Sequence, residues 1–221
     1  LYNFFVADEV PVPSWQITPP RDPEAITILE NALIDNQYEM RPVFEVLFNS
    51  DFFKNSLYTK VKSPAELVTG VMRLTESVDR PEYEYPAKEQ RMQFMGQTLM
   101  NPPSVEGWDG GTMWIDTGAL VERMNFASEE LGRLTTPGAE ELFNKIASDG
   151  NGEVLPDKIV DACLEHMGSI FIQDDTRTKL VNYATANDVV RVANNNIDDV
   201  GKESIAGVIR LIAATPEFQR A

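Results

Sequence analysis

The feature that most constrains the fold of this chain is a proline placed directly after a polar residue. It occurs at Asp22-Pro23, Ser63-Pro64, Thr136-Pro137 and Thr215-Pro216. Proline is favoured at the first position of a helix, where its missing N–H costs no hydrogen bond, and a polar residue before it can cap the helix end. Each pair therefore predicts the start of a helix or helical turn.

Apolar residues at helical spacing extend these starts and mark further helices. The expected helices cover residues 22–36, 40–48, 63–72, 86–99, 117–131, 136–146, 157–167, 174–183 and 202–214. Ser63 and Glu66 add a capping box, in which each side chain satisfies an open amide at the helix start. Strand patterns are weak and fall at residues 113–115 and 169–172, and residues 194–196 are a polar hinge before the last helix. We therefore predict an all-α fold, an irregular multi-helix bundle with long ordered loops.

Glycine and proline concentrate near residues 132–138, which predicts a division of the chain there. Residues 1–134 would form a helical core that carries a loop rich in proline, glycine and tryptophan. Residues 135–221 would form a C-terminal helical segment packed on that core.

The chain also opens in the apolar stretch of residues 1–6, which is typical of the end of a helix, so we interpret it as part of a longer protein.

Charge and cysteine content exclude several classes of protein. The chain of 221 residues has 19 Lys and Arg against 35 Asp and Glu, a formal charge of −16. Such an acidic surface repels phosphate backbones, so we expect no nucleic-acid partner. No apolar run is long enough to span a bilayer in this segment. One cysteine cannot form an internal disulfide, and one cysteine with one histidine cannot complete a structural zinc site.

One segment carries a likeness to a known family. Residues 99–111 read Leu-Met-Asn-Pro-Pro-Ser-Val-Glu-Gly-Trp-Asp-Gly-Gly, followed by Trp114-Ile115 and by Arg-Met-Asn-Phe-Ala at residues 123–127. This pattern resembles the signature of the bacterial domain of unknown function 1800 family. Supporting segments lie at residues 1–6, 40–53, 61–68 and 211–219.

The resemblance implies that the chain is the C-terminal half of a longer family domain. Many members of the family are exported and encoded beside a second family that resembles sulfatases, and no activity is established for it. We therefore expect a location outside the cytoplasm, at the cell surface, in the periplasm or secreted. The expected partners are the missing N-terminal half of the same protein and a second exported protein or a polysaccharide.

The loop of residues 101–114 is the best candidate for a binding site. Prolines fix its path, and Glu106, Trp108, Asp109 and Trp114 would make an aromatic and acidic pocket suited to a sugar or a cation. The alternative, which we favour, is that both tryptophans anchor the loop on the helices. The remaining candidates are Asn101 in the loop and, on the following helix, Arg123 and Asn125, with Arg123 expected to pair with Glu106 or Asp109.

A second loop has part of the residue spacing of a calcium-binding loop. Asp149, Asn151 and Glu153 alternate around Gly150 and Gly152. However, the same register places Ala147 at loop position one and Lys158 at position twelve, where calcium requires carboxylates. We favour a plain connection between helices, with weak calcium binding as the alternative. No other cofactor is expected.

No nucleophile and base stand out in the sequence. Cys163 and His166 lie three apart on one predicted helix, but Cys163 follows its core face. No Gly-x-Ser-x-Gly sequence is present. The leading hypothesis is an exported binding or assembly component of the envelope or extracellular space. The alternative is a hydrolase of a sugar, ester or sulfate ester, with Glu106 or Asp109 in a site shared with the missing half.

Overall fold

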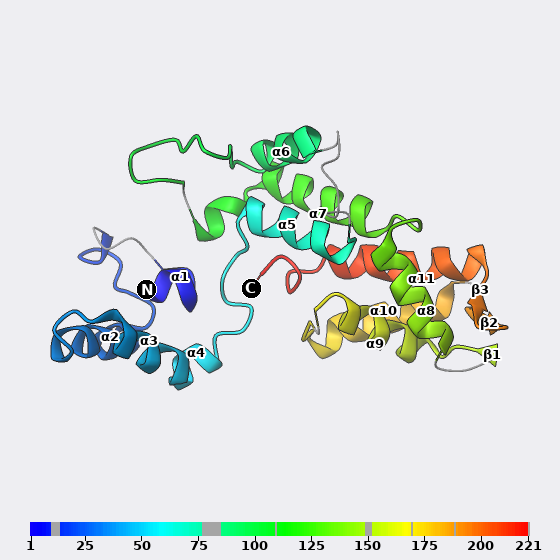
Figure 1. Ribbon diagram of the computed structural model, residues 1–221, viewed down its shortest axis with the longest axis horizontal. Coiled ribbons are helices and arrows are strands. Elements are labelled where there is room, and N and C mark those ends of the chain that lie inside the picture. Colours follow the sequence, from blue (N-terminus) through cyan, green and yellow to red (C-terminus); the bar gives the residue numbers. More distant parts are fainter. Residues whose placement is uncertain are drawn as a thin grey trace. The chain divides into compact units, whose positions relative to one another are not determined.

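The computed structural model describes residues 1–9, 14–76, 85–108, 110–148, 152–168, 170–187 and 189–220. In this part the chain is mostly α-helical, as predicted, with one small antiparallel sheet (Figure 1). The chain divides into two compact units. Unit 1 contains residues 1–61, 109–113 and 220–221, and unit 2 contains residues 62–108 and 114–219. The predicted division between residues 134 and 135 stays a prediction.

The described part of unit 1 contains four α-helices. They are α1 (Tyr2–Phe5), α2 (Pro23–Asp35), α3 (Met40–Asn49) and α4 (Asp51–Lys54). The predicted start of α2 is confirmed, because the Asp22 carboxylate accepts a hydrogen bond of 3.0 Å from the Ala25 amide. Helix α2 packs on α3 around Leu29, Val43 and Leu47. Aromatic side chains from α1 and α4 pack around this small core: Tyr2, Phe5, Phe52 and Phe53.

Unit 2 holds the larger core. Its helices are α5 (Pro64–Leu74), α6 (Tyr85–Phe94), α7 (Thr117–Leu131), α8 (Pro137–Ser148), α9 (Pro156–His166), α10 (Asp174–Ala186) and α11 (Asp199–Ala213). Helix α7 packs against α5, α6 and α11, and α9 packs against α8, α10 and α11. The capping box at Ser63 and Glu66 is confirmed in both directions. Side-chain caps set the starts of α5, α7, α8 and α11, whereas α9 and α10 begin without one.

Two helix boundaries differ from those expected. Helix α6 ends at Phe94 and does not reach Leu99, because Gly96 takes a left-handed conformation (φ 98°) and the Gln97 amide bonds back to the Met92 carbonyl at 2.9 Å. This is the Schellman pattern of a helix C-terminus. Helix α11 begins earlier than predicted, at Asp199, because the Asp198 side chain accepts a 2.7 Å hydrogen bond from the Gly201 amide.

The strand predictions were wrong in position. Residues 111–115 form a short 3-10 helix, η2 (Gly111–Ile115), and residues 170–172 form no strand, while Ser169 lies outside the described residues. The sheet consists of β1 (Gly152–Glu153), β2 (Arg191–Ala193) and β3 (Asn196–Ile197), in the order β1-β2-β3 with both pairs antiparallel. Strands of two or three residues are too short to show an alternating pattern in sequence.

The expected polar hinge at residues 194–196 is a hairpin turn. Asn194 and Asn195 have positive φ values of 53° and 57° and connect β2 directly to β3. Two left-handed residues in a two-residue connection match the twist of the flanking strands, and asparagine tolerates this conformation well. The turn therefore positions β3 and the start of α11 rather than acting as a flexible joint.

Candidate functional site

A closed loop follows the end of α6 in unit 2. The carbonyl of Thr98 accepts hydrogen bonds from the amide of Asn101 and from the indole Nε1 of Trp108, each 3.2 Å long. The bond from Asn101 forms a tight turn at the start of the segment, and the bond from Trp108 ties its end back to Thr98. We call residues 98–108 the anchored loop. In Figure 1 it is part of the long green segment that leaves α6. Compact loops of this size whose ends meet are often functional.

The tip of the anchored loop is a β-turn. The Gly107 amide donates to the Ser104 carbonyl at 3.1 Å, and the Glu106 amide donates to the Ser104 hydroxyl oxygen at 3.2 Å. Gly107 has a φ of 98°, which a side chain would disfavour. Val105 and Glu106 occupy the centre of this turn, and both side chains are exposed. Pro102 and Pro103 restrict the backbone before the turn, so the tip is presented by a stiff segment.

The apolar side chains of the anchored loop face solvent. Met100 is 94% exposed and Val105 is fully exposed. Met100 also has a left-handed backbone (φ 59°) at the third position of the turn closed by Thr98 and Asn101, where glycine is usual. A left-handed non-glycine residue is strained, and strain of this kind collects at functional sites. Met100 buries nothing within the described chain that would offset this cost.

The two tryptophans of the candidate pocket anchor the loop region. Trp114, in η2, is only 6% exposed, and its ring lies 3.6 Å from where a Cβ would stand on Gly96. Trp108 is partly buried, and its N–H is used by Thr98. Neither ring forms an open aromatic platform. Glu106 is exposed at the tip, Asn101 is exposed beside it, and Asp109 lies outside the described residues.

Arg123 does not make the expected pair with Glu106. Its side chain is fully buried, Nε donates to Gln219 Oε1 at 2.9 Å, and one Nη donates to the Lys62 carbonyl at 2.8 Å. Nη1 is buried without a hydrogen-bond partner. Burial lowers the pKa of Arg123 to about 10, although the charge of Glu66 acts in the opposite direction. Arg123 therefore fastens the C-terminal segment to the start of α5.

The position of Arg123 could have been found in the sequence. Ala119, Arg123 and Ala127 follow one another at intervals of four, and all three lie on the buried face of α7. Asn125 lies on the opposite, exposed face of α7. The sequence prediction assigned both to the loop because it weighed their chemistry and not their place on the helix.

The calcium-like loop is described only in part. Asp149 and Asn151 lie outside the described residues. Glu153 lies in β1 and forms a 3.1 Å ion pair with Arg191 of the neighbouring strand β2. Across the described ranges, no group of three or more His, Cys, Asp or Glu side chains is arranged to hold a metal ion.

Cys163 and His166 do not form a nucleophile and base. Cys163 is completely buried, and burial raises the pKa of its thiol to about 12, so the thiolate is not accessible at neutral pH. His166 lies at the end of α9 and is partly buried, and its pKa is lowered mainly by that burial. The interpretation of Cys163 as a core residue fits this environment.

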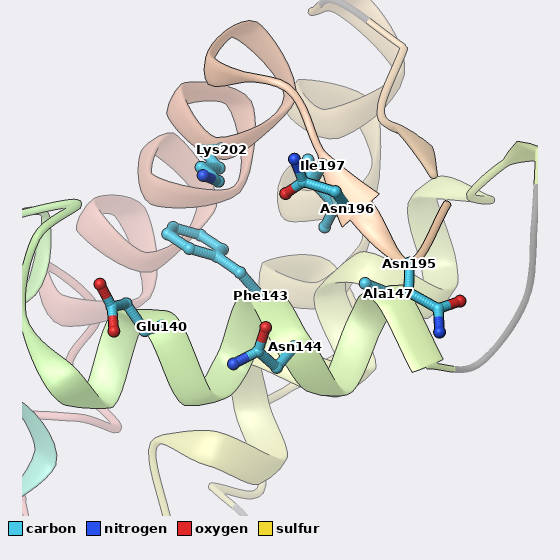
Figure 2. A pocket seen from close by; sticks show the side chains of 8 residues that line it. All are labelled: Glu140, Phe143, Asn144, Ala147, Asn195, Asn196, Ile197 and Lys202. Carbon is cyan, nitrogen blue, oxygen red and sulfur yellow. The ribbon is translucent and has the colours of Figure 1, made fainter. Parts of the chain in front are cut away.

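A small pocket of about 200 Å³ lies between α8, the β2–β3 hairpin and α11. Figure 2 shows the side chains that line it. Its floor is made by Phe143, Ala147 and Ile197, which are all buried. Phe143 points from α8 toward Lys202, whose ammonium lies 5.8 Å from the ring centre. This cation covers the ring, so the pocket offers little free aromatic surface to a ligand.

The family model described as a protein of unknown function (DUF1800) matches residues 1–220. The chain belongs to this family. No curated protein and no solved structure matches the chain. Within the described residues, no helix of this DUF1800 chain is both long and apolar enough to cross a membrane. Membership in the family assigns no activity, so the function is inferred from the anchored loop.

Proposed function

We propose that this chain is part of an exported bacterial protein of the envelope or extracellular space that binds another protein through the anchored loop. The observation that carries the proposal is the exposure of Met100 and Val105 on a loop closed at Thr98. Apolar side chains held in water by a rigid and strained segment are typical of an interaction surface. Methionine adapts its shape readily and is frequent in such surfaces.

The exposed groups favour a protein partner over a polysaccharide. A sugar ring would stack on an open aromatic face, and Trp114 is buried while Trp108 is partly covered. The large apolar side chains that face solvent are instead aliphatic or thioether groups: Leu99, Met100 and Val105. These gain free energy by entering an apolar protein surface. Family membership supports the location outside the cytoplasm, since many family members are exported.

The proposal can be tested in the bacterium that makes the protein. We would compare the wild type with Val105→Asp and with the control Val200→Asp, whose valine is 54% exposed on α11. Cells would be fractionated, and the protein in the envelope and the medium would be sized by gel filtration. The wild type and Val200→Asp should elute in a complex, and Val105→Asp should elute as the free protein. The proposal would be refuted if the protein were found only in the cytoplasm, or if Val105→Asp eluted at the same volume as the wild type.

The hydrolase alternative predicts a different result. Purified protein would turn over a glycoside, an ester or a sulfate ester, and Glu106→Gln would abolish that turnover. Because Glu106 is exposed at a turn, the same substitution should leave folding unchanged. Loss of turnover in a folded Glu106→Gln protein would therefore replace the binding proposal with a catalytic one.

A further inference from the structure

A second apolar feature of unit 2 is a pocket of about 290 Å³ beside α5. Its floor is formed by buried side chains of α5 together with Met167 and Phe218. Lys62 and Arg73 stand at its rim with Glu66. We call this the Gly70 pocket, after the glycine that lines its open side. It combines an apolar floor with two cationic side chains at the edge.

Gly70 has no packing role that would explain it. It lies in the interior of α5, where glycine weakens a helix relative to alanine. A Cβ built on Gly70 would meet no described atom within 4 Å. The glycine therefore leaves space that no described part of the chain fills, and it does so where a side chain would narrow the Gly70 pocket.

Of the two cations at the rim, Lys62 is held in place. The Lys62 ammonium donates a 2.8 Å hydrogen bond to the Phe218 carbonyl and lies 4.8 Å from the centre of the Phe218 ring. The pKa of Lys62 is lowered, first by burial and then by the charge of Arg123, although the carboxylate of Glu66 acts in the opposite direction. A carboxylate brought to this rim would relieve the unfavourable burial of positive charge. The pocket therefore suits a ligand that is apolar at one end and anionic beside it.

The tip of the anchored loop carries an apolar side chain next to an anionic one. Val105 is an exposed aliphatic side chain, and Glu106 places a carboxylate on the next residue of the same turn. Resting on the proposed function, we propose that the partner of the anchored loop is a second copy of this chain. Val105 of one copy enters the Gly70 pocket of the other, and Glu106 pairs with Lys62 or Arg73 at its rim.

Such a contact joins two different surfaces. Each copy can therefore insert its own loop into a second copy and accept the loop of another in its Gly70 pocket. Two copies form a closed symmetric pair where both contacts can be made at once, and rings or open chains where they cannot. The charge of −16 on each chain opposes association at low salt. At physiological ionic strength the screening length is about 8 Å, so distant charges repel weakly while the local pair remains.

Sedimentation velocity over a concentration series tests this assembly. The wild-type protein should sediment faster as its concentration rises. Val105→Asp places a charge in the apolar floor, and Gly70→Leu fills the pocket with a good helix former, so each should weaken association by about tenfold or more. Val200→Asp is the matched control and should associate as the wild type does. Circular dichroism and thermal melting would show that each variant is folded.

Mixing the two variants gives the decisive result. Val105→Asp retains an intact pocket and Gly70→Leu retains an intact loop, so an equimolar mixture should form a pair at concentrations where each variant alone stays monomeric. A wild-type protein that stays monomeric at every concentration, or a mixture that stays monomeric, would overturn the inference. If either occurs while the complex in cells still depends on Val105, self-association fails and the proposed function stands with a different protein partner.

Discussion

At Met100 the backbone adopts a left-handed conformation that methionine does not favour, and its side chain is exposed. We predict that Met100→Gly leaves the free energy of unfolding unchanged or raises it by up to about 1 kcal/mol, because glycine adopts this conformation without strain. Chemical denaturation would measure the change. The binding described above should weaken in the same variant, since it loses an apolar side chain.

Gln93 gives the matched control for Met100. It is exposed in α6, where the backbone is right-handed, and Gln93→Gly should lower the free energy of unfolding by about 1 kcal/mol. If Met100→Gly destabilises the protein as much as Gln93→Gly, then Met100 contributes packing to the fold, and its strain does not indicate a binding role.

Arg123 is the buried residue on which the C-terminal segment depends. We predict that Arg123→Met lowers the free energy of unfolding by about 2 kcal/mol, because the Gln219 side chain and the Lys62 carbonyl lose their donor. Arg41→Ala is the control, since Arg41 is exposed and pairs with the likewise exposed Glu45 of the next turn, and it should change stability by less than about 0.5 kcal/mol. Equal effects of the two substitutions would contradict a fastening role for Arg123.

The residues of the candidate site were only partly predictable. The loop of residues 101–114 was found because prolines, glycines and tryptophans are concentrated there. The roles of its side chains depend on which of them are covered, and this is set by contacts with Gly96 and Thr98. Arg123 was expected to pair with the loop because its charge was weighed and not its place on the buried face of α7. The Gly70 pocket has no local pattern at all, since Met167 and Phe218 reach it from distant parts of the sequence.

Helix starts were predicted well because capping is a local interaction. Asp22, Ser63 and Asp116 each accept a hydrogen bond from an amide three residues further on. The end of α6 at Gly96 and the hairpin at Asn194-Asn195 were missed. Both depend on left-handed backbone conformations that the residues allow but do not require. Short strands such as β1 depend on pairing with β2, which lies far along the chain.

The capping box of α5 offers a test at the level of a single element. Ser63→Ala should lower the free energy of unfolding by about 1 kcal/mol, because the Glu66 amide loses its acceptor and the reciprocal bond loses its support. Ser148→Ala is the comparison, since that hydroxyl donates to a carbonyl at the exposed end of α8, and its effect should stay within about 0.5 kcal/mol. Urea denaturation of both variants would show whether the start of α5 is stabilised by its cap.

The stability of the whole molecule should depend on His166 at mildly acidic pH. The pKa of His166 is lowered from 6.5 mainly by burial, although Glu141 and Glu76 act against the shift. As the pH falls below 6.5, the unfolded chain therefore binds a proton more readily than the folded protein, and stability is lost. The wild type should lose more stability than His166→Gln between about pH 7.5 and about pH 5. Parallel pH profiles for the two proteins would contradict this assignment.

The central claim about the whole molecule is that the anchored loop is its binding surface. Site-specific photo-crosslinking tests it most directly, with a photoreactive amino acid at position 105 and a control at position 200, in living cells of the source organism. The account predicts a discrete adduct from position 105 outside the cytoplasm, in which a second copy of this chain is the attached protein, and no such adduct from position 200. The same adducts from both positions, or none from position 105, would contradict the claim.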